Sequence, residues 1–475
     1  MPAKLLLINL ILIIFTRSAT GQSANKTPFE INTRYSFYSF EKNAELLLHV
    51  PQNMIYNNIS VILLLDDDTI GMWTGKPGKK IVRLPVNFDL QPANYKVIAD
   101  IRVAGSKFRY FASADLFVLT YKPNEVKTDR LTGGLIVNKR SFFPFGFYCY
   151  SPVHPALPEE EVVKGFNLIS PYQSILPETF SQRKAYMDRC ARLGMKVNYN
   201  LLSVSGGGGV SSLINGITGA QKRERLINEI IAFRDHPALL AWYIADEPTG
   251  YGIEPGVLEE IYSTVRKYDP WHPVSIVFMA PFLSSKKYLN ALDIVMADPY
   301  PVPNSPVTLV GNVAGQLCSE FKGKRPVWIV PQVFGGGEWW GREPSFQEVR
   351  AMTYQAIIKG ASGIQYFVRQ GLNLFPKSAS TWAECGRMAV EVSGLTPWLL
   401  SDEVTIPVRS ASGDILVSSA LHDNQLLVMA VNTKNSPQST GFSVSRMIYG
   451  KARVLFENRD INVISGYFTD QLSAF

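Results

Sequence analysis

The chain has 475 residues, of which 46% are hydrophobic and 18% are charged, and its formal net charge is +7. This length exceeds one ordinary domain, so two or three domains with a large buried core are expected. The basic residues form no long run, so the composition does not indicate a nucleic-acid partner.

The first residues have the pattern of a secretory signal peptide. Lys4 supplies a positive start, residues 5–15 an apolar core, and Ala19-Thr20-Gly21 a cleavage site of small residues. A membrane span needs about 20 apolar residues, whereas this run is shorter and is broken by Asn9. We therefore expect removal of residues 1–21, a secreted extracellular or lysosomal protein, and no membrane span.

Two N-glycosylation triplets, at Asn25 and Asn58, fit a secreted chain. The cysteines are too scattered to predict a metal knuckle or a disulfide framework, so stability is expected to come mainly from the core. They are Cys149, Cys190, Cys318 and Cys385.

Short apolar runs separated by turn residues fill the chain between Phe29 and about Tyr121. Regular spacing of this kind is typical of an antiparallel β-sandwich, which we assign to residues 28–124. The polar stretch 123–134 contains Pro and Gly and is expected to be a linker.

From Phe143 onward, short apolar runs alternate with longer amphipathic ones. Eight βα repeats over roughly 250 residues predict a closed (β/α)₈ TIM barrel, within residues 135–398. The eight expected strands are PFGFYCY, GFNLISPY, MKVNYNLLS, LLAWYIADEP, PVSIVFM, LDIVMADPYP, PVWIVPQVF and GIQYFV. The helical candidates include residues 178–194, 221–237, 258–270 and 345–361.

After about Ser401 the chain returns to alternating strands, exemplified by VTIPVRS, ILVSSALH, QLLVMAVNT and KARVLFE. This pattern predicts a small C-terminal β-domain over residues 400–475. The fold class is therefore α/β, with a barrel flanked by two β-domains.

The fourth expected barrel strand ends in the acidic pair Asp246 and Glu247, followed by Pro248. The functional site of such barrels is built from residues at the C-terminal ends of the strands, so this pair is a candidate for catalysis. A solvated turn leading into a helix is the alternative reading of the same three residues.

This strand end, AWYIADEP, resembles the Asn-Glu-Pro end of strand four in clan-A glycoside hydrolases. The lead-in DRLTGGLIVNKRSFFPFGFY also resembles the sandwich-to-barrel junction of the β-galactosidase and β-glucuronidase-like enzymes of that clan. The resemblance implies hydrolysis of O-glycosidic bonds with Glu247 as general acid/base. The sequence departs from the pattern of the clan at two positions. Gln332 stands where the resemblance places the nucleophilic Glu of strand seven, and Asp246 stands where the clan has Asn.

Three arrangements could supply the second catalytic group. Asp246 could orient a participating 2-acetamido group of the substrate, although adjacent strand residues point to opposite faces unless the strand is bulged. Glu338, or less readily Glu343, could reach back over the site from the strand-seven loop. Asp298 could activate water in an inverting reaction, which needs roughly 6.5 to 9.5 Å between carboxyl groups, or could simply cap a turn.

Aromatic side chains that stack on sugar rings are the other feature of a carbohydrate site. The candidates are Tyr148, Tyr300, Tyr366, Trp339 and Trp340, each of which could instead fill the core. Polar contacts to substrate are expected from Gln332, Asp298, Gln365 and Arg369, and Arg369 could instead cap a helix.

Neither a cofactor nor a metal ion is expected. The glycine run 206–209 lacks the lysine of a phosphate-binding loop and is expected to be a mobile loop over the barrel mouth. The five histidines show no ligand spacing. The sequence thus favours a secreted glycosidase acting on an oligosaccharide or glycan. The rival hypothesis is a catalytically inactive carbohydrate-binding or extracellular-matrix protein.

Overall fold

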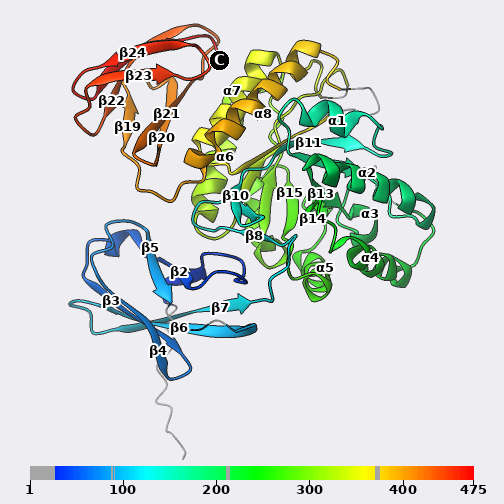
Figure 1. Cartoon of the computed structure of the whole chain (residues 1–475), viewed down its shortest axis with the longest axis horizontal. Helices are drawn as coiled ribbons and strands as arrows, with labels where there is room; N and C mark the ends of the chain where they lie inside the picture. The colour runs from blue at the N-terminus through cyan, green and yellow to red at the C-terminus, as the bar shows by residue number, and fades with distance from the viewer. Residues whose placement is uncertain (1–26, 87–88, 90, 210–213, 338, 370–374) are drawn as a thin grey trace, which may run out of the picture.

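The computed structural model describes residues 27–475, except 87, 88, 90, 210–213, 338 and 370–374. The expected signal peptide and Asn25 lie outside the described residues. The barrel has both β-domains on the same side (Figure 1). In this view the N-terminal domain, in blue, lies at the lower left, and the C-terminal domain, in orange and red, lies at the upper left.

The N-terminal domain consists of two antiparallel sheets with an apolar core between them. One sheet has the order β1-β2-β5 and the other β4-β3-β6-β7. The strands are β1 (Glu30–Thr33), β2 (Ala44–His49), β3 (Ile59–Leu65), β4 (Asp68–Gly75), β5 (Ile81–Val86), β6 (Ala93–Val103) and β7 (Arg109–Val118), with a 3-10 turn η1 (Gln52–Met54). Strand β1 is short and mostly polar, and β4 is largely exposed.

The stretch expected to be a linker is a buried part of the fold instead. It contains β8 (Val126–Thr128), which pairs with β9 (Leu135–Val137), and β9 pairs with β10 (Arg140–Phe142). Lys127 of β8 is fully buried, with Nζ 2.7 Å from Glu41 and 3.2 Å from Glu125. The linker predicted from the polar composition is therefore wrong, because charged side chains can be buried when they form ion pairs.

The barrel is closed, with eight parallel strands in sequence order and β18 pairing with β11. All eight expected strands are confirmed: β11 (Phe145–Tyr150), β12 (Leu168–Tyr172), β13 (Lys196–Asn200), β14 (Leu239–Asp246), β15 (Val274–Phe278), β16 (Ile294–Ala297), β17 (Val327–Ile329) and β18 (Gly363–Tyr366).

Helices surround the barrel, and the four helical candidates correspond to α2, α4, α5 and α7. The described helices are α1 (Leu157–Val162), α2 (Phe180–Leu193), α3 (Leu202–Ser205), α4 (Gly219–Phe233), α5 (Pro255–Tyr268), α6 (Thr308–Phe321), α7 (Phe346–Ile358) and α8 (Ala379–Leu399), with 3-10 segments η2 (Pro177–Thr179) and η4 (Phe282–Ala291). Thr218 and Ser345 begin α4 and α7 with capping boxes, which satisfy free N–H groups of the first turn.

Alternation along each strand separates two layers of side chains. Phe147 and Cys149 face the helices, whereas Tyr148 between them faces the barrel interior. The interior also holds a polar layer, in which Asn198 donates to Gln365 (3.3 Å) and accepts from Ser275 (3.0 Å).

The C-terminal domain contains three small antiparallel sheets, β19-β22-β25, β20-β21 and β23-β24. Its strands are β19 (Val408–Ser410), β20 (Ile415–His422), β21 (Gln425–Asn432), β22 (Gln438–Val444), β23 (Gly450–Val454), β24 (Arg459–Val463) and β25 (Tyr467–Leu472). Strands β20 and β21 contact α7, and β20 also contacts α8, which attaches the domain to the barrel.

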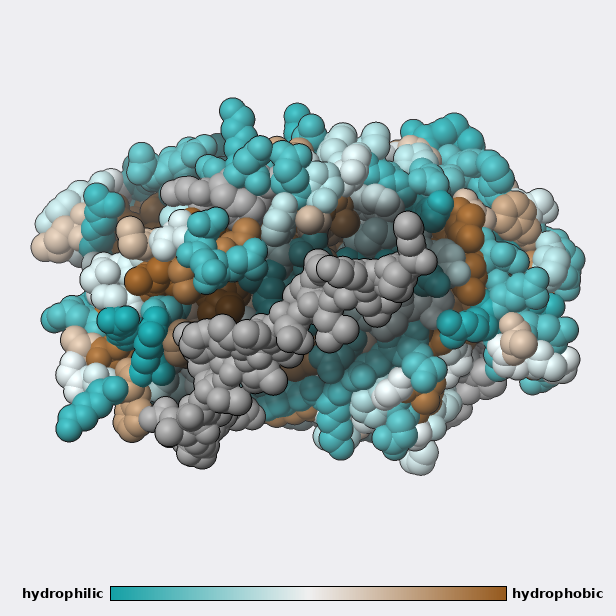
Figure 2. Space-filling view, turned by 90° about the horizontal axis from the view of Figure 1, so that it is seen from below, coloured by the Kyte–Doolittle hydropathy of each residue, from teal (hydrophilic) through white to brown (hydrophobic). Residues whose placement is uncertain are grey.

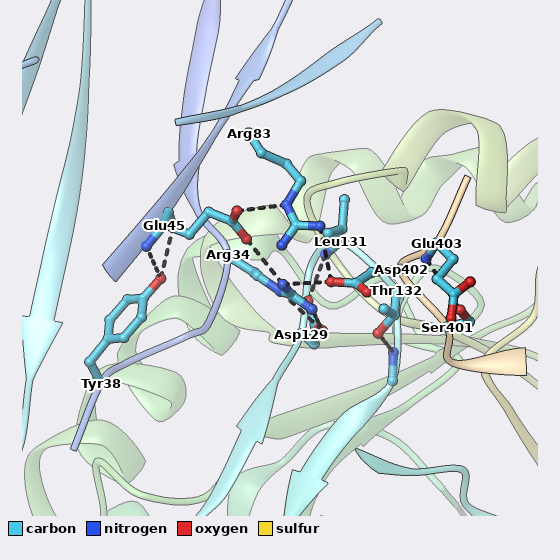
Figure 3. Close-up of polar contacts among 11 residues, drawn as sticks. Arg34, Tyr38, Glu45, Arg83, Asp129, Leu131, Thr132, Ser401, Asp402 and Glu403 are labelled. Carbon is cyan, nitrogen blue, oxygen red and sulfur yellow. Dashed lines mark hydrogen bonds and ion pairs between the residues drawn. The ribbon is translucent and has the colours of Figure 1, made fainter. Parts of the chain in front are cut away.

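A charge network joins the three parts of the chain (Figure 3). The Arg34 guanidinium follows β1 and lies 3.0 Å from carboxylate oxygens of Glu45, Asp129 and Asp402. Arg83 pairs with the same Glu45 and Asp402. Because Asp129 precedes the barrel and Asp402 precedes β19, this network fixes both β-domains against the barrel.

The predicted fold class, a TIM barrel flanked by two β-domains, is confirmed. All four cysteines are free. No helix among the described residues is long and apolar enough to cross a membrane. On the face shown in Figure 2, hydrophilic side chains cover most of the surface and hydrophobic ones form separate patches.

Candidate active site

The end of β14 turns two neighbouring carboxyl groups toward the barrel mouth. The pairing of β14 with β15 shifts register between Tyr243 and Ala245, and Glu247 has a φ of 49°, which non-glycine residues rarely adopt. The backbone N–H of Glu247 donates to the Val277 carbonyl at 2.9 Å, which fixes this conformation. The geometric objection to a joint role of Asp246 and Glu247 is thereby removed.

Asp246 lies among tyrosines. The Tyr172 hydroxyl donates to Oδ2 of Asp246 at 2.9 Å. Burial raises the pKa of Asp246 to about 6, and the neighbouring Glu247 adds to this rise, whereas hydrogen bonds from Tyr243 and Tyr172 oppose it.

Asp298 follows β16 and is the third carboxyl group of the site. Its side chain is buried, and burial raises its pKa well above the ordinary range. The Glu247 carboxyl lies within hydrogen-bonding reach of Asp298 and raises this pKa further, as does Asp246. Protonation of Asp298 is therefore favoured next to Glu247 relative to a free carboxyl group.

This contact does not fit two of the roles expected for Asp298. Carboxyl groups in hydrogen-bonding reach are much closer than the roughly 6.5 to 9.5 Å of an inverting pair. Asp298 is also no turn cap, because its buried Oδ1 accepts no hydrogen bond from the described residues.

Aromatic rings line two sides of the carboxyl cluster. Tyr148 lies with its ring centre 5.3 Å from that of Tyr172 and 5.7 Å from that of Tyr243. On the other side, Tyr300 stacks on Phe367 at 5.9 Å with an interplanar angle of 27°.

Further rings extend this second side. Trp340 and Phe334 lie edge-on to Tyr300, with centre distances of 5.8 and 5.0 Å. Trp339 is 75% exposed. The expected Tyr148, Tyr300 and Trp340 thus lie around the cluster, and Trp339 directly precedes Trp340 in the loop after β17. Sequence reasoning missed Tyr172, Tyr243, Phe334 and Phe367, although the first two occupy inward positions of expected strands.

Two expected polar contacts are occupied within the barrel. The Gln332 amide donates to the carbonyls of Val302 (2.9 Å) and Phe334 (3.0 Å), and its oxygen accepts from the Val302 N–H (2.9 Å). Gln332 therefore joins the loops after β16 and β17. Gln365 is fully buried and accepts a hydrogen bond from Asn198 in the interior layer. The Gln332 amide is fully hydrogen-bonded, whereas Nε2 of Gln365 has no hydrogen-bond partner among the described residues.

Two other expected contacts face the surrounding helices. The Tyr366 hydroxyl pairs with Thr353 of α7 at 2.7 Å and is buried there. Arg369 points to α1, where Nε donates to buried Glu161 at 3.1 Å, and its guanidinium lies over the Trp382 ring. The substrate contacts expected of Tyr366 and Arg369 are therefore wrong.

The strand-seven loop offers no free carboxylate among its described residues. Glu343 accepts hydrogen bonds from the backbone N–H groups of Lys377 (2.5 Å) and Ser378 (3.1 Å), so it caps the start of α8. Glu338 lies outside the described residues.

The glycine run packs against the end of β14. Gly207 forms a parallel bridge with Ala245, and its carbonyl accepts from the Asp246 N–H at 2.8 Å. A Cβ at Gly207 would stand 1.9 Å from the Ile244 carbonyl oxygen, so only glycine permits this approach. The run holds the strand end in place.

One described group has the arrangement of potential metal ligands, Glu403, His422 and Asp423 on the β20-β21 side of the C-terminal domain. Asp246, Glu247 and Asp298 are not among the groups of possible metal ligands found in the described residues.

No protein-family model and no curated protein matches the chain. Similar solved structures include a β-D-glucuronidase from Dictyoglomus thermophilum, with a TM-score of 0.41, 13% identity, and coverage of 75% of this chain and 68% of that one. A GH2 β-galacturonidase from Eisenbergiella tayi bound to galacturonate gives 0.40, 14%, 77% and 72%. A β-glucuronidase from Bacteroides uniformis gives 0.39, 11%, 94% and 60%.

The chain spans between 60% and 72% of the lengths of these structures. A likeness at this identity and TM-score does not bear on activity, which has to be argued from the site itself.

Proposed function

We propose that this chain hydrolyses O-glycosidic bonds of an oligosaccharide or glycan, with Glu247 as general acid/base. The observation that carries the proposal is the gathering of Asp246, Glu247 and Asp298 at the ends of two barrel strands, β14 and β16. Glycosidic cleavage needs a carboxylic acid that protonates the leaving oxygen.

The proton comes from the carboxyl pair. Burial and the neighbouring Glu247 raise the pKa of Asp298 well above its ordinary value, which favours a proton held between the two carboxyl groups, and Glu247 passes this proton to the glycosidic oxygen. Asp246 and the adjacent tyrosines orient the sugar. The group that stabilises the anomeric carbon is either a participating group of the substrate or Glu338, and these two routes give different trapped intermediates.

A second candidate function is carbohydrate binding without turnover. The observation in its favour is Gln332, whose fully engaged amide occupies the strand end where the resemblance places a nucleophile. Such a protein would need only the aromatic walls and the hydrogen bonds of the mouth.

We also propose that the chain is secreted. The support is the leader pattern of residues 1–21 and the exposed Asn58 sequon just before β3. N-terminal sequencing of protein from the culture medium, before and after endoglycosidase treatment, tests both.

The test of hydrolysis is a panel of aryl glycosides, including N-acetylhexosaminides, assayed over pH with wild type and Glu247→Gln. Loss of a general acid should lower the rate on the order of 10² to 10⁴-fold. Cleavage by wild type but not by the variant supports the proposal. If neither cleaves any glycoside and wild type still binds sugars, the binding function is the correct one.

A further inference from the structure

The carboxyl groups at the mouth have no lysine or arginine partner among the described residues. Among the described residues, Glu247 raises the pKa of Asp246, and Asp246 and Asp298 raise the pKa of Tyr148. No lysine or arginine is among these groups.

Two cations that follow β18 make contacts elsewhere. Arg369 is paired with buried Glu161. Lys377 is exposed, with its ammonium over the Phe375 ring. The stretches 210–213 and 370–374 contain no lysine or arginine in the sequence, so they cannot supply one.

Buried polar atoms beside the carboxyl groups point to a ligand. Oδ1 of Asp298 accepts no hydrogen bond, the Tyr148 hydroxyl makes none, and Nδ2 of Asn200 makes none within the described chain. All three side chains are more than nine-tenths buried. Buried polar groups are normally paired, so this set fits a partner that donates to carboxylates and accepts from a hydroxyl and an amide.

We infer that the mouth binds sugars whose ring carries a protonated amine and excludes sugars that carry a carboxylate. The inference rests on the proposed carbohydrate site and specifies its substrate class. An ammonium group donates three hydrogen bonds and neutralises the cluster, while the sugar hydroxyls accept from Tyr148 and Asn200. A uronate would add a further negative charge to a partly desolvated acidic site, which is unfavourable.

The test is direct binding by the full chain at pH 6.5, measured by ligand-observed NMR titration. The probes are matched in ring configuration: glucosamine, N-acetylglucosamine, glucose and glucuronate, with the same set in the galacto series. In at least one series the amino sugar should bind roughly tenfold or more tightly than the neutral sugar. The reason is that the attraction between opposite charges a few ångströms apart in such a site exceeds the free energy of a tenfold change in affinity. The uronate should bind weakest.

N-acetylation removes the positive charge and keeps the nitrogen, so it should abolish the advantage, that is, the tighter binding of the amino sugar over the neutral sugar. Asp298→Asn should reduce the advantage, whereas Asp188→Asn, which removes a carboxylate on the outer helix α2, should preserve it. Retention of the wild-type melting temperature verifies that the Asp298 variant is folded. Raising the salt concentration to 0.5 M should also reduce the advantage by screening.

Equal or tighter binding of uronates or N-acetyl sugars, or no binding of any amino sugar at millimolar concentrations, would overturn the inference. The outcome is separable from that of the proposed hydrolysis. Amine-selective binding without cleavage of any aryl glycoside leaves the inference standing and removes the hydrolase. Cleavage with a preference for uronides leaves the hydrolase standing and removes the inference.

Discussion

Replacing Asp246 with Asn should change how the stability of the barrel depends on pH. In the folded chain the pKa of Asp246 is raised from 3.8 to about 6, mainly by burial. The folded state therefore binds a proton more tightly than the unfolded state. This group's contribution to stability is fully present below about pH 3.8 and is lost as pH rises through about 6.

The magnitude follows from the shift of roughly two pKa units, which corresponds to about 3 kcal/mol. The amide that replaces the Asp246 carboxyl in this variant can still accept the Tyr172 hydrogen bond but carries no charge. The unfolding free energy of Asp246→Asn relative to wild type should therefore rise by up to about 3 kcal/mol between pH 4 and pH 7. For a domain of this size that is roughly 5 to 10 °C in melting temperature.

The assay is thermal unfolding followed by tryptophan fluorescence at half-unit pH steps, because Trp242 and Trp328 are buried in the barrel. Asp188→Asn is the matched control. Hydrogen bonds from Lys184 and His236 lower the pKa of Asp188, so its effect should run in the opposite direction. A melting-temperature difference for Asp246→Asn that is flat or falls with rising pH would refute the reasoning.

Three further predictions concern the frame of the site. Arg34→Met should lower the unfolding free energy by about 3 to 5 kcal/mol, because it leaves the buried Asp129 carboxylate without its partner. Arg83→Met removes only half-exposed ion pairs and should lower the unfolding free energy by less than about 1 kcal/mol. Comparable losses for both variants in chemical unfolding would contradict the role given to the network. Gly207→Ala should lower kcat at least about tenfold, because the added Cβ would displace the end of β14. Gly219→Ala adds a Cβ where there is free space and should leave kcat unchanged. Equal kcat values for both variants would show that the contact of Gly207 with β14 is dispensable. Gln332→Glu should lower the melting temperature more at pH 7 than at pH 4, because a buried carboxylate cannot donate hydrogen bonds to the Val302 and Phe334 carbonyls. The variant should also not gain activity. A variant that is as stable as wild type and more active would contradict the structural role assigned to Gln332.

The barrel could be predicted from the sequence because each strand is a short apolar run bounded by turn residues and followed by an amphipathic segment. The strands β8 and β22 could not be found in this way. Lys127 is buried through its ion pairs, and β22 is rich in small polar residues, so hydropathy does not reveal either strand.

The candidate site was predictable only in part, for geometric reasons. Asp246 and Glu247 share the mouth because of a register shift and one left-handed residue, and neither leaves a signal in the pattern of apolar residues. The proximity of Asp298 to Glu247 depends on how neighbouring strands are aligned, which spacing along the chain does not encode. Arg369 could not be assigned from the sequence, because its partner Glu161 lies more than two hundred residues earlier on α1.

The central claim is that the carboxyl group of Glu247 protonates a leaving glycosidic oxygen. The most direct test compares kcat/KM of wild type and Glu247→Gln on two glycosides of the same sugar, one with phenol and one with 2,4-dinitrophenol as the leaving group. We expect the variant to lose on the order of 10² to 10⁴-fold on the phenyl glycoside and far less on the dinitrophenyl glycoside, which leaves without protonation. Equal losses on both substrates, or wild-type rates on both, would contradict the claim.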